Sequence, residues 1–191
     1  MRFFTADQHL GHVNIISFCV RPFASVEAMN EALLANWTDT VSEDDEIWVL
    51  GDVAMGRIAE TLPPIAALPG RKHLVPGNHD RCWPGNRRVR PVDEQMYVDV
   101  GFEIHPGSVD LHLENVPVVA CHFPVAGDSQ VEDRFVDHRP VVPADGWLLH
   151  GHVHQNWKVN NGQINVGVDV WDFRPVSEEK LLDLMQSGRV T

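Results

Sequence analysis

Aspartate, asparagine and histidine residues gather in five short groups along this chain, most of them where an apolar run gives way to a glycine or a loop. Their carboxylate, amide and imidazole groups form an oxygen and nitrogen ligand set that suits Mn²⁺, Fe or Zn²⁺ better than Mg²⁺. A carboxylate can bridge two ions where an imidazole cannot, and two bridged ions are typical of hydrolytic sites. The groups contain Asp7, His9, Asp52, Asn78, His79, His122, His152 and His154.

The spacing within the groups also favours a shared site. In a strand, residues two apart project to the same face, so Asp7 and His9 could reach one ion. His152 and His154 could reach the same place from a second sheet, and Asp52, alone at a strand end, is the natural bridging ligand. A single Asp-x-His or His-x-His is a weak signal, because a histidine at a strand end more often has a structural role. The joint occurrence predicts a metal site.

The elements that must position these groups are short apolar runs with β-favouring residues, which we expect to be buried strands. Between the first two runs, apolar residues repeat at spacings of three and four, which predicts an amphipathic helix over 25–40 with Ser25 as its N-cap. The predicted strands are 3–5, 46–50, 73–75, 118–121 and 147–149.

The remaining elements follow from turn and breaker residues. A second helix is expected over 54–62, where Pro63 and Pro64 should end it. The βαβα first half and the β-rich second half predict a single α/β domain, 1–191, in which two sheets pack face to face with helices outside. Ligands collect beyond the carboxyl ends of strands in such folds. We also predict pairing of 109–114 with 116–121, a hairpin over 159–164 and a closing helix over 177–185.

The five groups resemble the motifs of the calcineurin-like metallophosphoesterases and occur in that family's order. Two flanking segments, 9–16 and 165–175, are similar to segments of the small bacterial and phage phosphoesterases in the same superfamily. The resemblance implies a four-layer α/β/β/α sandwich of two mixed sheets flanked by helices. The motifs are Asp7-Gln8-His9, Gly51-Asp52, Gly77-Asn78-His79-Asp80, His122 and Gly151-His152-Val153-His154.

The resemblance also implies a binuclear centre of two divalent ions, with Mn²⁺ as the first expectation and Fe, Zn²⁺ or Ni²⁺ as alternatives. One ion would be held by Asp7, His9, Asp52 and His154, and the other by Asp52, Asn78, His122 and His152.

His79 is then left for catalysis, where it could stabilise the transition state or protonate the leaving oxygen. Asp80 could orient and charge the His79 imidazole, with a purely loop-capping role as the alternative. The nucleophile would be a hydroxide that bridges the ions and attacks in line with the leaving group. Candidate contacts to the substrate phosphate, each with a structural salt bridge as the alternative, are His12, Arg21, Arg81 and Arg174.

The composition limits the kinds of partner that this chain is expected to bind. The formal net charge of −12 disfavours an extended nucleic-acid surface, which needs many basic residues, but allows a small phosphate ester. The apolar runs are far shorter than the roughly 20 residues that cross a bilayer, and no signal peptide is recognisable, so we expect a cytoplasmic protein without a membrane partner. The oligomeric state is not predicted. Three cysteines without a close pair should be reduced and structural.

The predicted function is therefore a phosphodiesterase for small phosphodiesters, such as nucleotides or cyclic nucleotides. The alternatives are a phosphomonoesterase or nucleotide pyrophosphatase, and, in another class, a noncatalytic metal-bound scaffold for protein interactions. The chain has no P-loop and no Gly-x-Ser-x-Gly elbow. Five further histidines lie outside the family motifs and are expected to be structural or exposed: His73, His105, His112, His138 and His150.

Overall fold

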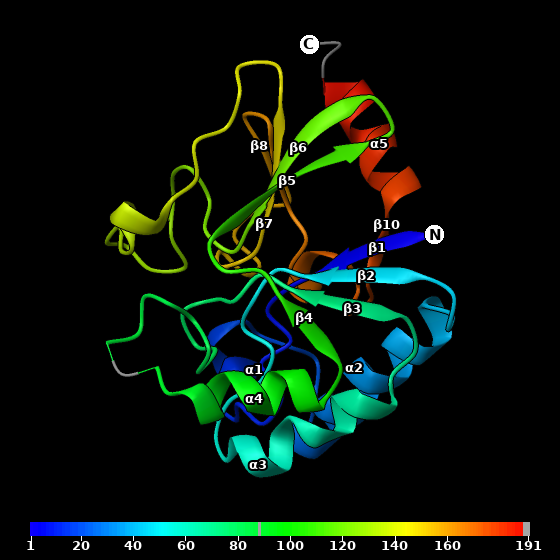
Figure 1. Cartoon of the computed structure of the whole chain (residues 1–191), viewed down its shortest axis with the longest axis vertical. Helices are drawn as coiled ribbons and strands as arrows, with labels where there is room; N and C mark the ends of the chain where they lie inside the picture. The colour runs from blue at the N-terminus through cyan, green and yellow to red at the C-terminus, as the bar shows by residue number, and fades with distance from the viewer. Residues whose placement is uncertain (88, 189–191) are drawn as a thin grey trace.

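Two five-stranded sheets face each other in the computed structural model, which describes residues 1–87 and 89–188 (Figure 1). The first sheet has the strand order β10-β1-β2-β3-β4, in which β1 to β4 run parallel and β10 runs antiparallel to β1. Its strands are β1 (Arg2–Thr5), β2 (Glu46–Val49), β3 (Arg71–Leu74), β4 (Phe102–Ile104) and β10 (Val176–Ser177).

The second sheet has the order β5-β6-β7-β9-β8. Its central strands β6, β7 and β9 run parallel, while β5 and β8 form antiparallel hairpins with β6 and β9. Both hairpins were expected from the sequence and are confirmed. The strands are β5 (Ser108–Leu113), β6 (Val116–Cys121), β7 (Trp147–His150), β8 (Val159–Asn160) and β9 (Gln163–Asn165).

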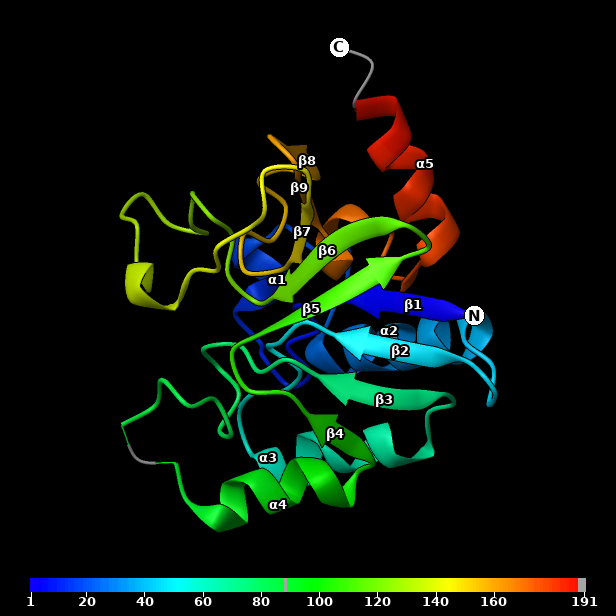
Figure 2. The same cartoon turned by 45° about the horizontal axis from the view of Figure 1, so that its top comes forward.

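Helices cover the outer face of the first sheet, as Figure 2 shows for α2, α3 and α4. The longest, α2 (Val26–Thr40), begins as predicted at Ser25, whose hydroxyl accepts the backbone N–H of Ala28. None of the helices in the described residues combines the length and the apolar character that a bilayer crossing requires. The other helices are α1 (Ile15–Phe18), α3 (Ile58–Thr61), α4 (Pro91–Asp99) and α5 (Glu178–Gly188), and the 3-10 helices are η1 (Pro63–Ala67), η2 (Val136–His138) and η3 (Val168–Val170).

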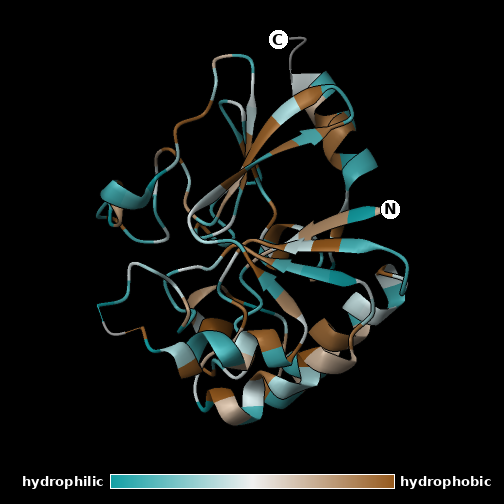
Figure 3. Cartoon of the chain, viewed as in Figure 1, coloured by the Kyte–Doolittle hydropathy of each residue, from teal (hydrophilic) through white to brown (hydrophobic). Residues whose placement is uncertain are grey.

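Successive residues of the strands enter different apolar layers, because side chains alternate between the faces of a sheet. Phe3 and Ile47 pack under the helices, whereas Phe4 and Trp48 pack between the sheets. The helix α5 joins the layer between the sheets through its apolar face, and its ribbon alternates between hydrophobic and hydrophilic residues in Figure 3. The outer face of the second sheet packs against Trp83, Phe123, Phe135 and Val142.

The predicted two-sheet α/β sandwich is confirmed, but one predicted helix is wrong. The segment 54–62 is helical only over α3, because Ala54 forms a bridge to Leu10 and Gly56 has a φ of 73°. The prolines at 63 and 64 begin η1 instead of ending a helix, since proline suits the first turn, where its missing N–H is not needed. The helix α4 was not predicted.

Candidate metal centre

Five of the seven predicted metal ligands have a left-handed backbone, which residues other than glycine rarely adopt. The φ angle is 57° at Asp7 and Asp52 and 52° at His9. At His152 and His154 it is 71° and 49°. All five lie in the loops that follow β1, β2 and β7. The prediction that Asp7 and His9 project from one face of a strand is therefore wrong, because both residues lie beyond the end of β1. Such strained conformations gather at functional sites, where the surrounding structure must hold them in place.

Asp52 lies between two histidines that come from different sheets. Its Oδ2 atom is 3.6 Å from Nε2 of His9 and 3.5 Å from Nε2 of His122. Its Oδ1 atom accepts the backbone N–H of His79 at 2.9 Å, which fixes the orientation of the carboxylate. One oxygen thus faces two imidazoles that the family resemblance would assign to different ions.

The ring of His122 is oriented by the backbone carbonyl of Leu50, which lies 2.8 Å from its Nδ1 atom. A carbonyl oxygen only accepts hydrogen bonds, so Nδ1 carries the proton and Nε2 presents its lone pair. This Nε2 atom faces Oδ1 of Asn78 at 3.2 Å as well as the Asp52 carboxylate. Three electron-rich atoms that face one another suit a bound cation.

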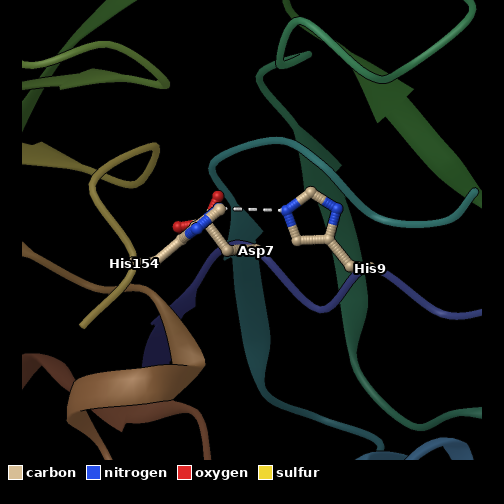
Figure 4. A group of neighbouring side chains, drawn as sticks. All are labelled: Asp7, His9 and His154. Atoms are coloured by element: carbon tan, nitrogen blue, oxygen red, sulfur yellow. Dashed lines mark hydrogen bonds between the residues drawn. The ribbon is translucent and has the colours of Figure 1, made fainter. Parts of the chain in front are cut away.

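On the other side of Asp52, the imidazoles of His9 and His154 and the carboxylate of Asp7 converge (Figure 4). The Nε2 atoms of the two histidines lie 3.2 Å apart. Both carboxylate oxygens of Asp7 accept the backbone N–H of His152, at 3.1 and 2.9 Å, and so join the loops of the two sheets. The Sγ atom of Cys19 lies 3.3 Å from Nδ1 of His154 and supports that ring from behind.

Two overlapping groups of these side chains could hold a metal ion, because in each group the ligand atoms lie within 4.8 Å of one another. Both groups consist of buried or half-buried residues and share Asp7. They are Asp7, His9 and His154, and Asp7, Asp52 and His122.

Burial shifts the protonation of these ligands toward their neutral forms. It raises the pKa of Asp7 and Asp52, each of which is removed from water. It lowers the pKa of His9 well below its ordinary value and lowers the pKa of both His152 and His154 to about 3. The imidazoles are therefore neutral near pH 7, which is the form that binds metal. Two buried carboxylates side by side need a positive charge before both ionise readily.

His79 lies at the surface of this group, with its ring centroid 5.4 Å from that of His9. Burial lowers the pKa of His79, and the nearby Asp80 carboxylate opposes that shift. The described hydrogen bonds of the Asp80 carboxylate are to backbone groups and to the Tyr97 hydroxyl, and none of them is to the His79 imidazole. Asp80 accepts the N–H groups of Asp52, Val53 and Gly77, which agrees with the alternative that it caps the loop.

A pocket of about 470 Å³ opens beside His9, His79 and His154. His12, one of the predicted substrate contacts, lines it, and burial lowers the pKa of this histidine. Its wall combines apolar and polar side chains: Ile15, Phe18, Cys19, Met55, Ser129, Gln130, Arg134, Val153, Gln155 and Asn156.

None of the three predicted arginine contacts lines this pocket. Arg21 is buried, pairs with Asp169 at 2.8 Å and donates to the backbone carbonyl of Asp7. It therefore supports the ligand loop from behind. Arg174 lies near the end of α2, where it contacts the Thr40 hydroxyl. Arg81 lines a separate surface pocket together with Arg87 and Arg90.

Asp128 and Arg134 belong to the site but were not predicted. Oδ2 of Asp128 lies 3.2 Å from Nε2 of His152, and the Arg134 guanidinium pairs with the same carboxylate at 2.7 Å. A carboxylate behind an imidazole commonly orients it as a metal ligand. Both residues lie in a long irregular segment between β6 and β7, where no periodic pattern marks them.

Two further residues shape the ligand loops. The buried amide of Asn165 donates to the backbone carbonyl of His154 and so fixes that loop. Gly77 packs so closely that a Cβ atom there would overlap the Asp52 carboxylate and the ring of His122. Only glycine lets the backbone approach the ligands this closely.

Comparisons with known proteins place the chain among relatives of the same length. No known family model matches it. A crystal structure of a protein of unknown function from Aquifex aeolicus superposes with a TM-score of 0.70 at 24% identity, over 96% of this chain and 98% of that one, and shows the same fold. The phosphoesterase Yfce from E. coli aligns at 18% identity over 87% of this chain and 77% of its own, but its TM-score of 0.41 is too low to support a conclusion.

Two phage proteins are similar enough to define a family. The Gene 66 protein of Mycobacterium phage L5 is 32% identical, in an alignment that covers 95% of this chain and 92% of that protein. The alignment therefore leaves out little of either chain. The Gene 66 protein of Mycobacterium phage D29 is also 32% identical, over 92% of this chain and 92% of that protein. The chain therefore belongs to the family of the phage L5 Gene 66 protein.

Proposed function

We propose that this chain is a binuclear metal-dependent phosphoesterase that acts on small phosphodiesters. The observation that carries the proposal is the position of Asp52, whose Oδ2 atom lies within 3.6 Å of imidazole nitrogens from both sheets. A carboxylate in this position suits the bridging role that a two-metal hydrolytic site requires. The remaining ligands surround it from four loops, next to a pocket.

The residues present fit two divalent ions. Asp52 would contact both ions. One ion would also be held by Asp7, His9 and His154, and the other by Asn78, His122 and His152. When bound, the ions supply positive charge for the phosphoryl oxygens and lower the pKa of a water molecule to near neutrality. Neutral imidazoles and hard carboxylate oxygens make Mn²⁺ the first metal to test.

The chain itself binds and orients the substrate. The pocket beside the ligands has apolar walls at Ile15, Phe18 and Met55, against which an organic substituent could pack. His79 lies at its mouth, where its ring could donate to the leaving oxygen of a phosphate held at the ligands.

The charge of the pocket favours a diester over a monoester. Arg134 is the one arginine or lysine among the described residues that line it, and its charge is already paired with Asp128. A phosphodiester carries one negative charge, whereas a monoester carries nearly two at neutral pH and so needs more compensation. None of these described lining residues offers an unpaired positive charge that could compensate the second negative charge of a monoester.

The test compares hydrolysis of bis-p-nitrophenyl phosphate and p-nitrophenyl phosphate by the purified chain with Mn²⁺. We expect the diester to be hydrolysed faster, and we expect a chelator to abolish both activities. Asp52→Asn should remove the bound metal together with the activity, while Asp110→Asn, the same change at an exposed aspartate on β5, should alter neither.

Each alternative predicts a different result. A clear preference for the monoester would favour a phosphomonoesterase and overturn the diesterase assignment. Cleavage of a nucleoside triphosphate at its anhydride bonds, with no turnover of the diester, would favour a nucleotide pyrophosphatase. Protein that holds two metal ions yet hydrolyses none of these compounds would favour the noncatalytic scaffold.

A further inference from the structure

We infer that the chain has a second metal site, formed by His73, Glu103 and His105. This second site takes a zinc-like divalent ion and is separate from the proposed catalytic centre. None of the three belongs to the family motifs, and none lines the pocket beside the ligands. The sequence alone suggested no chemistry for the two histidines, which it assigned to structural or exposed positions.

The distances among the three side chains match a metal site. Nδ1 of His73 lies 3.0 Å from Nε2 of His105 and 3.5 Å from Oε2 of Glu103. Nε2 of His105 lies 3.6 Å from Oε1 of Glu103. Around a tetrahedral zinc with ligand bonds of about 2.0–2.2 Å, neighbouring ligand atoms lie roughly 3.3–3.5 Å apart. The three groups thus already stand at nearly the separations that a shared ion imposes.

The backbone holds these residues in register. β3 and β4 run parallel with His73 opposite Glu103, and the N–H of His105 donates to the carbonyl of Leu74 at 2.8 Å. Glu103 lies in β4 and His105 follows directly after its end, where this backbone hydrogen bond continues the pairing with β3. The site therefore rests on two paired strands, which fix the positions of its ligands better than a loop would.

Two further side chains back the cluster. The Trp48 indole stacks on the rings of both His73 and His105, at centroid distances of 4.4 and 4.9 Å. Oε1 of Glu46 accepts the Trp48 indole N–H at 2.7 Å and lies 3.5 Å from Nε2 of His73. When that Nε2 carries the proton, Nδ1 turns its lone pair toward Glu103 and His105. A carboxylate behind a ligating imidazole in this way is a common feature of metal sites.

Exposure leaves the cluster open to an incoming ion. The His73 side chain is only 8% exposed, which fixes its ring, whereas those of Glu103 and His105 are 64% and 23% exposed. An ion held by two imidazoles and one carboxylate would keep a fourth position for water on the exposed side, and it would clamp β4 to β3 at the end of the first sheet.

The experiment measures zinc binding to the full chain, with Zn²⁺ alone as the ligand. Protein is loaded with Zn²⁺, exchanged into metal-free buffer and analysed for zinc content, and its affinity is measured by competition with a chromophoric chelator. We expect Glu103→Gln and His105→Asn each to hold one equivalent of zinc fewer than the unmodified chain. Glu46→Gln should keep the ion but weaken its binding roughly 10- to 100-fold, as expected when the group behind a ligand is altered.

Matched controls separate this site from the catalytic centre. Glu132→Gln and His112→Asn make the same chemical changes at exposed positions and should leave the zinc content unchanged. Asp52→Asn should lose the catalytic ions and still bind this one, so the two proposals fail independently. Far-UV circular dichroism confirms that each variant is folded. A zinc content equal to that of the unmodified chain in either folded ligand variant would overturn the inference.

Discussion

At the scale of single residues, the site depends on side chains whose backbone is strained. Asp7, His9, Asp52, His152 and His154 hold left-handed conformations that cost roughly 1–3 kcal/mol each. Neighbouring contacts must offset this cost, and Asp80 supplies several of them through the N–H groups of Asp52 and Val53. The capping carboxylate thus acts on the metal site indirectly, by holding the loop that carries its central ligand.

His79→Ala tests the catalytic role of the surface imidazole. We expect bound metal to be retained, because His79 is not among the ligands, and turnover to fall by roughly 10²–10⁴-fold, the usual contribution of a positioned acid or base. The loss should be largest for diesters with poor leaving groups. The measurement is kcat on a series of aryl phosphodiesters of rising leaving-group pKa. An equal loss across the series would exclude proton donation and leave only stabilisation of charge.

Asp80→Asn tests the loop cap. An asparagine retains one acceptor oxygen but points its amide N–H₂ at backbone donors, so buried N–H groups lose their partners at about 1–3 kcal/mol. We expect the free energy of unfolding in urea to fall by that order and metal affinity to fall with it. Asp110→Asn, at an exposed position, is the control. Unchanged stability in Asp80→Asn would show that the three backbone hydrogen bonds contribute little.

At the scale of elements, a buried ion pair connects the loop after β1 to the segment that contains η3. Arg21 pairs with Asp169, which lies in η3, and also donates to the carbonyls of Asp7 and Gln8. Through these contacts, the segment around Asp169 positions the loop after β1. A residue far along the chain thereby supports a ligand near the N-terminus.

Asp169→Asn should destabilise the fold strongly, because it leaves the buried Arg21 charge without its partner. We expect a loss of about 3–5 kcal/mol in the free energy of unfolding, measured in urea. Asp39→Asn breaks the exposed pair with Arg174 and should cost no more than about 1 kcal/mol. If the two variants lose the same amount, the buried pair is not the anchor of this loop.

At the scale of the whole molecule, the proposed ions join the two sheets. Asp7, His9 and Asp52 follow strands of the first sheet, whereas His122 and His152 follow strands of the second. The ligands exist together only in the folded chain, so metal binding should add to the free energy of folding. The sheets otherwise meet through the apolar layer around Phe4, Trp48 and Leu149.

Thermal unfolding with and without metal tests this coupling. Free Mn²⁺ at about 100 times its Kd should stabilise the fold by about 2.7 kcal/mol per site, because it binds only the native state. For a chain of this size that corresponds to a rise in Tm of roughly 5–10 °C. The measurement is scanning calorimetry in Mn²⁺ and in chelator. Asp52→Asn is the control and should show no such rise, and an equal rise in it would place the stabilising ion elsewhere.

The sequence by itself determined the ligand types, their order and the elements that carry them. The strands, the helix α2 with its cap at Ser25 and both hairpins follow from periodicity and turn residues, which are local properties. The two-residue spacing also predicted that the side chains of Asp7 and His9 lie close together. They do, but in the loop after β1 and not on a shared strand face. The left-handed backbone at these residues is imposed by the packing of loops and was invisible in the sequence.

Only the tertiary structure decided which polar side chains meet. It turned Arg21 inward to Asp169, placed Asp128 behind His152 and directed Asp80 to backbone groups, because each contact joins segments that are distant in sequence or lie in irregular loops. It also brought His73 against Glu103 and His105 through the pairing of β3 with β4. Residue type and spacing, with the family resemblance, could name the candidate ligands, but contacts set by burial and strand pairing decided how those side chains are held.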